Sequence, residues 1–257
     1  MKVLSSPKEV IAWRHAIGGD RSVGLVPTMG GLHAGHRSLI GRCRGENDVC
    51  VVSLFVNPTQ FNDKRDLERY PDTRDLDLAM CRQEDVDLLF TPVYEALYPD
   101  GYRYRVMEND QSRLLCGADR PGHFEGVLTV VAKLLNLVRP ARAYFGEKDF
   151  QQFQLVKGLT EAFFIPVQIV PCPIVREEDG LAMSTRNLNL TPDERRRAGE
   201  FPRLLAAAGD AGSVRAGLEN AGFQVDYVAD FQGRRCGAVR VGSVRLIDNL
   251  PLLEETP

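Results

Sequence analysis

Residues 23–36 of the chain read VGLVPTMGGLHAGH, a short apolar run followed by two glycines and two histidines. The run Val23–Pro27 predicts a buried β-strand, because it is apolar and ends at proline and glycine. A helix is expected from about Ala34 to Arg44. Glycines let the backbone approach a phosphate, and the N–H groups at a helix start favour an anion. This stretch therefore predicts a strand, loop and helix suited to holding a phosphate group.

His33 and His36 are three residues apart at the start of this helix. Residues with that spacing share one helix face, so both rings can meet the same phosphate. There they could stabilise charge that builds on an α-phosphate. The alternative is a capped helix start with two surface histidines. Metal binding by the pair is disfavoured, because the neighbouring sequence offers no third ligand.

Strands and helices alternate up to about residue 174. The further strands that we expect are Val49–Val56, Val86–Phe90, Ala141–Phe145 and Val167–Val170. The further helices that we expect are Arg74–Glu84, the apolar stripe Val127–Val138, which stops at Pro140, and Phe150–Phe163. Strands that are apolar on both faces predict a Rossmann-like parallel sheet with helices on both faces, an α/β fold. Such sheets bind ligands at the carboxyl ends of their strands.

A second, smaller domain is expected from residue 175 to residue 257, after a first domain at 1–174. Its segments are a polar stretch, a helix that opens at Pro192, and short strands near Val225–Tyr227 and Val239–Leu246. Mixed helices and short strands of this kind indicate an α+β domain.

The composition is that of an ordinary globular protein, with a formal net charge of −3. This balance argues against a broadly basic surface, and therefore against nucleic acid and an anionic membrane as partners. The longest apolar run, Val49–Val56, is too short to span a bilayer. The six cysteines are scattered without a CxxC pair, which favours reduced thiols in the cytoplasm over zinc or disulfides.

The histidine motif resembles the HIGH signature of the adenylyl- and cytidylyltransferase superfamily. Four further blocks narrow the resemblance to the pantothenate synthetases. They are FVNPTQF at 55–61, RPGHFEGV at 120–127, YFGEKDFQQ at 144–152 and VREEDGLAMSTRN at 175–187. Because five ordered blocks over about two thirds of the chain match, the resemblance is specific.

Asn57 and Gln60 follow the second strand and offer neutral amides. Amides orient the hydroxyls of a hydroxylated acid without neutralising a carboxylate that must react. Taken alone, the pair also fits a turn in which an asparagine is hydrogen-bonded before proline. The resemblance implies that Gln60 and Gln152 hold pantoate, with Asn57 and His123 in the same pantoate and β-alanine site.

Lys148 follows the strand-end Gly146 and is the natural phosphate cation of its block. Asp149 is placed to take a ribose hydroxyl or to orient the lysine, although a solvated Glu-Lys-Asp triplet is the alternative. Ser184, Thr185 and Arg186 add two hydroxyls and a second cation. They resemble a mobile loop that closes over the triphosphate of ATP, the alternative being an interdomain turn with an N-cap serine.

The resemblance also implies which other residues bind ATP and which take part in catalysis. The remaining ATP contacts are Pro27, Thr28, Met29, Gly30, Gly146, Val175 and Met183. The residues expected in catalysis are His33, His36, Lys148, Ser184, Thr185 and Arg186. Asp77 could bind Mg²⁺, or it could simply favour a helix start.

In the implied reaction, the pantoate carboxylate attacks the α-phosphate of ATP, and the β-alanine amine then displaces AMP from pantoyl-adenylate. Mg²⁺ would bridge the ATP phosphates, and a homodimer is expected. One alternative is another nucleotidyltransferase of the superfamily, which would need extra cations for a phosphorylated substrate. The other is a nucleotide-binding homologue that has lost catalysis, because Thr185 replaces the family's second serine and the C-terminal domain is shortened.

Overall fold

The computed structural model describes residues 1–252. Over these residues the chain forms two compact units. The first unit comprises residues 1–147 and 151–172, and the second comprises residues 148–150 and the chain from Pro173 onward.

The first unit is built on a six-stranded sheet in which every pairing is parallel. In order across the sheet, the strands are β1 (Lys2–Leu4), β4 (Leu88–Phe90), β3 (Val49–Leu54), β2 (Val23–Thr28), β5 (Arg142–Gly146) and β6 (Gln168–Cys172). The first four residues of both β2 and β3 are buried, as expected of strands covered on both faces. The prediction of a Rossmann-like α/β fold is confirmed.

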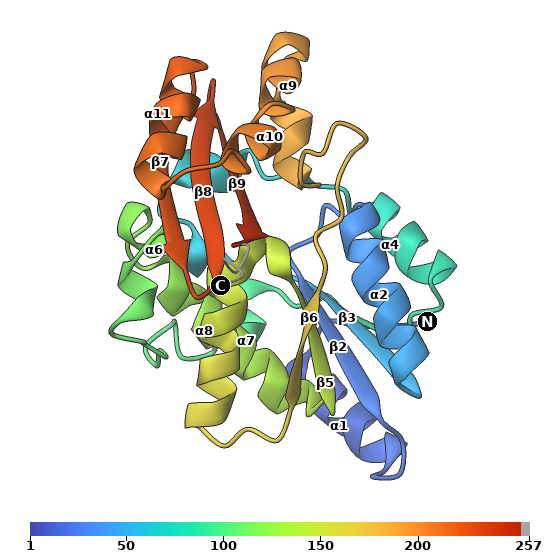
Figure 1. The fold of residues 1–257 in the computed structure, drawn as a ribbon. Helices are drawn as coiled ribbons and strands as arrows, with labels where there is room; N and C mark the ends of the chain where they lie inside the picture. Colours follow the sequence, from blue (N-terminus) through green and yellow to red (C-terminus); the bar gives the residue numbers. More distant parts are fainter. Residues whose placement is uncertain (253–257) are drawn as a thin grey trace. The chain divides into compact units, whose positions relative to one another are not determined.

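Helices cover both faces of this sheet (Figure 1). On one face lie α2 (Ala34–Glu46) and α4 (Arg74–Gln83), whose apolar side chains join the sheet in one buried cluster. On the other face lie α1 (Pro7–Ile17), α7 (His123–Val138) and α8 (Phe150–Ala162). Short helical turns link them, namely η1 (Pro58–Gln60), α3 (Lys64–Glu68), α5 (Tyr94–Leu97), η2 (Gln111–Arg113), α6 (Cys116–Asp119) and η3 (Glu147–Asp149). Strand β1 and helix α1 were not expected from the sequence.

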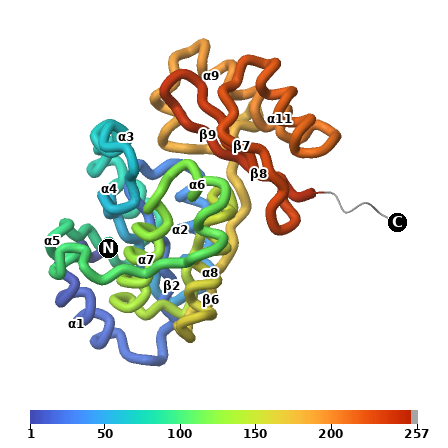
Figure 2. The backbone as a smooth tube through the Cα atoms, turned by 90° about the vertical axis from the view of Figure 1, so that its left-hand side faces the viewer, coloured from blue at the N-terminus to red at the C-terminus, as the bar shows by residue number. Residues whose placement is uncertain are grey.

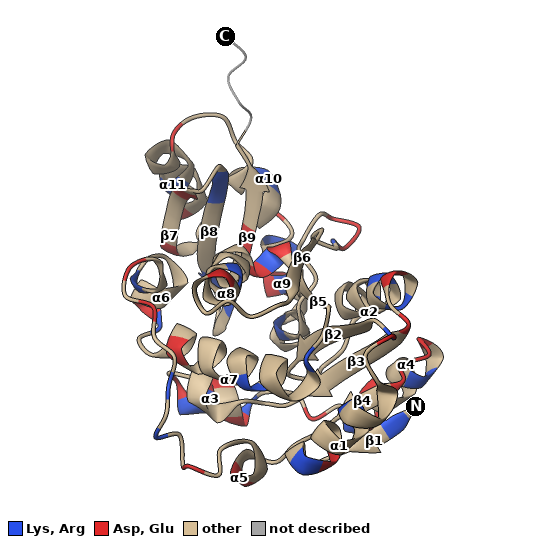
Figure 3. Cartoon of the chain, turned by 90° about the horizontal axis from the view of Figure 1, so that it is seen from below, with Lys and Arg blue, Asp and Glu red and all other residues tan. Residues whose placement is uncertain are grey.

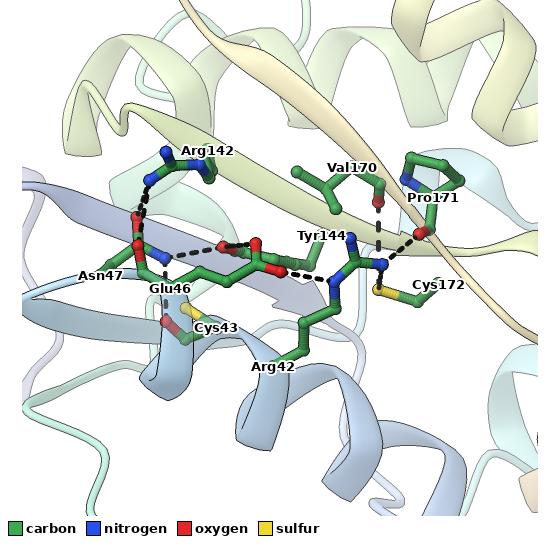
Figure 4. A network of polar contacts seen from close by, with 9 residues as sticks. All are labelled: Arg42, Cys43, Glu46, Asn47, Arg142, Tyr144, Val170, Pro171 and Cys172. Atoms are coloured by element: carbon green, nitrogen blue, oxygen red, sulfur yellow. Dashed lines mark hydrogen bonds and ion pairs between the residues drawn. The ribbon is translucent and has the colours of Figure 1, made fainter.

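A polar network ties the C-terminal half of α2 to β5 and β6 (Figure 4). The Tyr144 hydroxyl, fully buried in β5, donates to Glu46 Oε2 at 2.9 Å and accepts from Asn47 Nδ2 at 2.7 Å. Arg42 donates to the same Glu46 carboxylate at 2.8 Å and to the carbonyl oxygen of Pro171 at 2.6 Å. Because these bonds join three elements, they fix the axis of α2 against the sheet.

The second unit contains an antiparallel sheet of three strands, β7 (Gln224–Phe231), β8 (Arg234–Val241) and β9 (Val244–Pro251). Figure 2 shows α11 (Ala211–Asn220) beside β7. The unit also holds η4 (Thr185–Asn189), α9 (Pro192–Ala198) and α10 (Phe201–Leu205). The short strands expected near Val239–Leu246 are the end of β8 and the start of β9, which are joined by a turn in which Gly242 has φ +56°.

Gly126 lets α7 approach η1. A Cβ atom at this position would lie 2.5 Å from the carbonyl oxygen of Thr59, which is too close for any real contact. We expect Gly126→Ala to lower the free energy of unfolding by about 1–3 kcal/mol, since the backbone must shift. Gly158 in α8 has no atom within 4 Å of such a Cβ. Gly158→Ala is therefore the matched control, and we expect it to stabilise by about 0.5–1 kcal/mol in urea unfolding.

Candidate active site

The strand order reverses at β2, because the chain passes from β2 to β3 on one side and returns with β5 on the other. Ligands of open parallel sheets bind where the order reverses, at the carboxyl ends of the strands. The loop Met29–Leu32 leaves β2 at this point. Gly30 and Gly31 have φ values of +89° and +66°, which glycine adopts without strain. The predicted phosphate loop therefore lies at the end of the sheet where ligands are expected.

The carboxylate of Asp77 binds the main chain of this loop. It is buried and accepts from the main-chain N–H of Gly31 at 3.0 Å and of Leu32 at 2.8 Å. Thr73 Oγ1, at the N-cap of α4, donates to Asp77 Oδ2 at 3.1 Å. Both carboxylate oxygens are therefore engaged by the protein, which favours a capping role for Asp77 over the metal-ligand role.

The two histidines cap the N-terminus of α2 reciprocally. His33 Nδ1 accepts from the N–H of Gly35 at 3.1 Å, and His36 Nδ1 accepts from the N–H of His33 at 3.3 Å. Their ring centroids lie 4.2 Å apart. Because a main-chain N–H can only donate, each Nδ1 must be unprotonated, and each neutral ring carries its proton on Nε2. His33 is the N-cap of α2 and His36 lies in its first turn, so the structure has the capped helix start that the sequence offered as the alternative. In these tautomers each ring carries its N–H on Nε2.

The amides predicted to bind pantoate lie next to this loop. Gln60 Nε2 is 2.9 Å from Met29 Sδ, which joins the end of β3 to the loop after β2. His123, at the start of α7, is buried and its Nδ1 lies 2.8 Å from the carbonyl oxygen of Gln60. Arg120 can only donate, so its contact of 3.1 Å makes His123 Nε2 the acceptor and Nδ1 the donor. His123 therefore supports the backbone of Gln60.

Two neighbouring glutamines at the start of α8 have different surroundings. Gln151 is buried, accepts from the N–H of Cys116 at 3.1 Å and donates to the carbonyl oxygens of Gln111 and Leu114 at 2.8 Å. Gln152 is half-buried, and its side chain makes no hydrogen bond to residues 1–252. This contrast agrees with the choice of Gln152 as the glutamine available to a substrate.

Lys148 and Asp149 belong to the second unit. The two charges are 3.7 Å apart, and the Lys148 side chain is 21% exposed. Asn249 in β9 donates to the carbonyl oxygen of Lys148 at 3.0 Å, which anchors the backbone of the lysine. Lys148 therefore has a fixed main chain and a partly exposed ammonium group, as a phosphate-binding cation requires.

The loop expected to close over the triphosphate is held by hydrogen bonds between residues of the same stretch of chain. The N–H of Met183 donates to the carbonyl oxygen of Val175 at 3.0 Å, and Ser184 caps η4 by accepting from the N–H of Arg186 at 3.3 Å. Thr185 is buried, whereas Ser184 and Arg186 are half-buried. Ser184 therefore has the N-cap role that the sequence offered as the alternative.

Arg176 supports this loop through a contact that the sequence did not reveal. Its guanidinium donates to both carboxylate oxygens of Asp248 in β9, at 2.7 and 2.9 Å, and to the carbonyl oxygen of Gly180 at 2.9 Å. The Asp248 side chain is 1% exposed. A bidentate pair of this kind fixes geometry, so Arg176 holds the start of the loop against the sheet of the second unit.

Basic and acidic residues are interspersed along the helices (Figure 3). No helix within residues 1–252 is long and apolar enough to cross a membrane. Over the same residues, no group of three or more His, Cys, Asp or Glu side chains could hold a metal ion.

The geometry above is that of a nucleotide-binding parallel α/β fold with a HIGH-like motif at its switch point. The family model for pantoate-beta-alanine ligase matches residues 2–251. The chain belongs to this family.

Individual relatives agree with the family model. Pantothenate synthetase of Bdellovibrio bacteriovorus is 55% identical over 98% of this chain and 99% of its own. The enzyme of that name from Legionella pneumophila is 48% identical over 97% and 99%. The structure of pantoate-beta-alanine ligase from Francisella tularensis, complexed with beta-gamma ATP and beta-alanine, superposes with a TM-score of 0.93 at 39% identity, covering 100% of this chain and 99% of that one.

We expect Asp77→Asn to loosen the glycine turn. An asparagine has only one acceptor oxygen, so either Gly31 or Leu32 loses its hydrogen bond to this side chain, at a cost of about 1–3 kcal/mol in stability. The N–H of Gly31 would still reach Thr73 Oγ1, which lies 3.1 Å away. The KM for ATP should rise about tenfold or more, since 1.4 kcal/mol corresponds to a factor of ten. Steady-state kinetics at several Mg²⁺ concentrations check this. The exposed Asp75 of the same helix turn is the control, as Asp75→Asn. A mutant whose only change is a higher Mg²⁺ requirement would contradict the capping role.

Arg195 in α9 donates to the carboxylate of Asp179, with one contact of 3.1 Å, and holds the pKa of that carboxyl below its usual range. A lowered folded pKa gives stability that is present above the unfolded pKa, near about 4, and lost as pH falls through the folded pKa. We expect Asp179→Asn to weaken this acid dependence, by at most about 1 kcal/mol because the pair is partly exposed. Urea unfolding between pH 6 and about 2.5 measures it. The exposed pair Asp193–Arg196 supplies the control Asp193→Asn, for which an equal effect would contradict the assignment.

Proposed function

We propose that the chain condenses pantoate with β-alanine, consuming ATP and releasing AMP and pyrophosphate through pantoyl-adenylate. The observation that carries this proposal is the contact of Met29 with Gln60. It joins a loop suited to a nucleotide phosphate with neutral amides suited to a hydroxylated acid, within one unit. Membership of the pantoate-beta-alanine ligase family supports the same activity.

In the first step, a carboxylate oxygen of pantoate forms a bond to the α-phosphorus of ATP. The bond from that phosphorus to the bridging oxygen breaks, and pyrophosphate leaves with the electron pair. The Nε2–H groups of His33 and His36 donate to the α-phosphate oxygens as charge builds on them. Lys148 and Arg186 offset the charge of the phosphates. Neither cation needs to exchange a proton with the substrate.

In the second step, the unprotonated amine of β-alanine attacks the carbonyl carbon of pantoyl-adenylate. The carbon–oxygen bond to AMP then breaks, and the new amide nitrogen gives its extra proton to solvent. Adenylation is what makes this step fast, because AMP is a far better leaving group than oxide. The chain supplies orientation and charge stabilisation, without a covalent intermediate on the enzyme.

The acid substrate would be held by Gln60 and Gln152, whose side chains are neutral. A neutral site leaves the pantoate carboxylate unpaired and nucleophilic, whereas an arginine there would lower its reactivity. Val175 and Met183 would contact the nucleotide, together with Pro27, Thr28 and Gly30. Asp149 would take a ribose hydroxyl.

We further propose the setting of this reaction. Mg²⁺ would arrive with ATP as the ion that bridges its phosphates, because Mg²⁺ at such sites is held largely by substrate phosphates and water. The enzyme would work in the cytoplasm, where ATP is supplied, and as a homodimer, as the family resemblance implies.

The direct test is an assay of AMP release by the purified chain. We expect release only when ATP, pantoate and β-alanine are all present, with pantothenate formed in equal amount. With ATP and pantoate but without β-alanine, we expect pyrophosphate release to stop after a single turnover. That result would fit a pantoyl-adenylate that stays bound until the amine is added. Binding of ATP without any pantoate-dependent release would contradict the proposal and support a homologue without catalysis.

Two substitutions test the charge-stabilising roles. We expect His36→Ala and Lys148→Ala each to lower kcat by about 10²–10³-fold, since each removes a group that contacts charge in the transition state. His15, an exposed histidine of α1, gives the control His15→Ala. Undiminished pantothenate formation by folded Lys148→Ala protein would reject the role of the lysine.

A further inference from the structure

Asn57 is 1% exposed, and its side-chain oxygen is saturated by the protein. Asn57 Oδ1 accepts from the N–H of Thr59 at 3.4 Å, from Thr59 Oγ1 at 2.9 Å and from the hydroxyl of Tyr98 at 3.1 Å. The main-chain N–H can only donate, so this end of the amide must be the oxygen. Asn57 therefore has no acceptor left for a substrate.

The nitrogen end of Asn57 is equally committed. Asn57 Nδ2 donates to the carbonyl oxygen of Gly126 at 3.2 Å and to Gln60 Oε1 at 3.1 Å. A main-chain carbonyl can only accept, which confirms the orientation of the Asn57 amide independently. It follows that Gln60 turns its oxygen toward Asn57 and its nitrogen away from it.

The nitrogen of Gln60 is left with a poor partner. Gln60 is 8% exposed, and within residues 1–252 its Nε2 has only the thioether sulfur of Met29, a weak acceptor, at 2.9 Å. A buried donor without a good acceptor is costly, so the position favours a ligand that brings an oxygen.

We propose that Asn57, oriented by main-chain groups, fixes the polarity of Gln60, and that Tyr98 is a positioning residue that holds Asn57 in place, so that the site presents an N–H donor to an oxygen of the acid substrate. This inference rests on the proposed function, because the substrate is taken to be pantoate. It adds to that function a chain of three side chains, Tyr98, Asn57 and Gln60, in which each amide can adopt only one orientation.

Tyr98 is suited to the start of this chain. Burial raises the pKa of Tyr98 to about 12, so its hydroxyl stays protonated and able to donate. The ring is held by Tyr94, with centroids 4.9 Å apart, by Tyr102 at 5.4 Å, and by the ammonium of Lys133 at 5.0 Å from its centroid. Phenylalanine can keep this packing, so the role of the hydroxyl can be tested alone.

We expect Tyr98→Phe to raise the KM for pantoate about 2- to 10-fold, which is the range of one net hydrogen bond, and to leave the KM for ATP unchanged. Tyr94→Phe is the matched control, because the Tyr94 hydroxyl makes no hydrogen bond to residues 1–252. If Tyr98→Phe does not fold, Thr59→Val removes another donor to the same oxygen and replaces it in the test. A purely structural role would move the unfolding midpoint while leaving the pantoate KM as it was.

Asn57→Asp tests the polarity itself. An aspartate can still accept from Thr59 and Tyr98 but cannot donate, so Gln60 must rotate its amide and present oxygen to the substrate. We expect the KM for pantoate to rise about 100-fold, because a substrate oxygen then meets an acceptor. Adding Tyr98→Phe to this variant should cause little further loss, since the chain is already broken.

The outcomes separate the two proposals. If the wild-type chain forms no AMP with pantoate, the proposed function fails. If the wild type is active but Tyr98→Phe leaves the pantoate KM unchanged, or raises the KM for ATP equally, Tyr98 does not position Gln60. If Asn57→Asp keeps the wild-type pantoate KM, the polarity of Gln60 is not fixed by Asn57.

Discussion

The parallel pairing of β2 with β3 on one edge and β5 on the other is the constraint on which the site depends. It holds both edges of β2, and burial of Val23–Val26 holds both faces. The segment that follows β2 therefore leaves the sheet at the carboxyl end of this strand, in a fixed direction. Thr28 secures the exit by donating to the carbonyl oxygen of Ser53 at 2.8 Å. The end of β2 therefore sets the positions of the glycine turn and of the histidine cap that follow it in the chain.

The first unit contributes side chains that are neutral in their proposed roles, and main-chain groups set their orientation. The Nδ1 atoms of His33 and His36 accept from main-chain N–H groups, and the amide of Asn57 lies between a main-chain donor and a main-chain acceptor. The cations proposed for the phosphates, Lys148 and Arg186, belong to the second unit.

The sequence predicted the elements that local patterns define and missed those that depend on distant partners. Helices α2 and α4 were expected within two residues of their observed ends, because their apolar spacing and caps are local. Strand β1 has three residues and exists by pairing with β4, more than 80 residues away, so no local signal marks it. Motifs indicated His33, Gln60 and Gln152 as candidate residues. They could not show that Asp77 binds the glycine turn, because that contact crosses 46 positions.

The tautomers of the two histidines limit what they can do in the reaction. Protonating Nδ1 of either ring removes the acceptor for a main-chain N–H and breaks the cap of α2. The doubly protonated imidazolium is therefore opposed by the same bonds that place the rings. The neutral ring still offers Nε2–H, and a neutral donor can stabilise a phosphate without holding pyrophosphate or AMP by a full charge. A site that must release two anionic products gains from donors of this kind, provided that the permanent charges come from residues outside the cap.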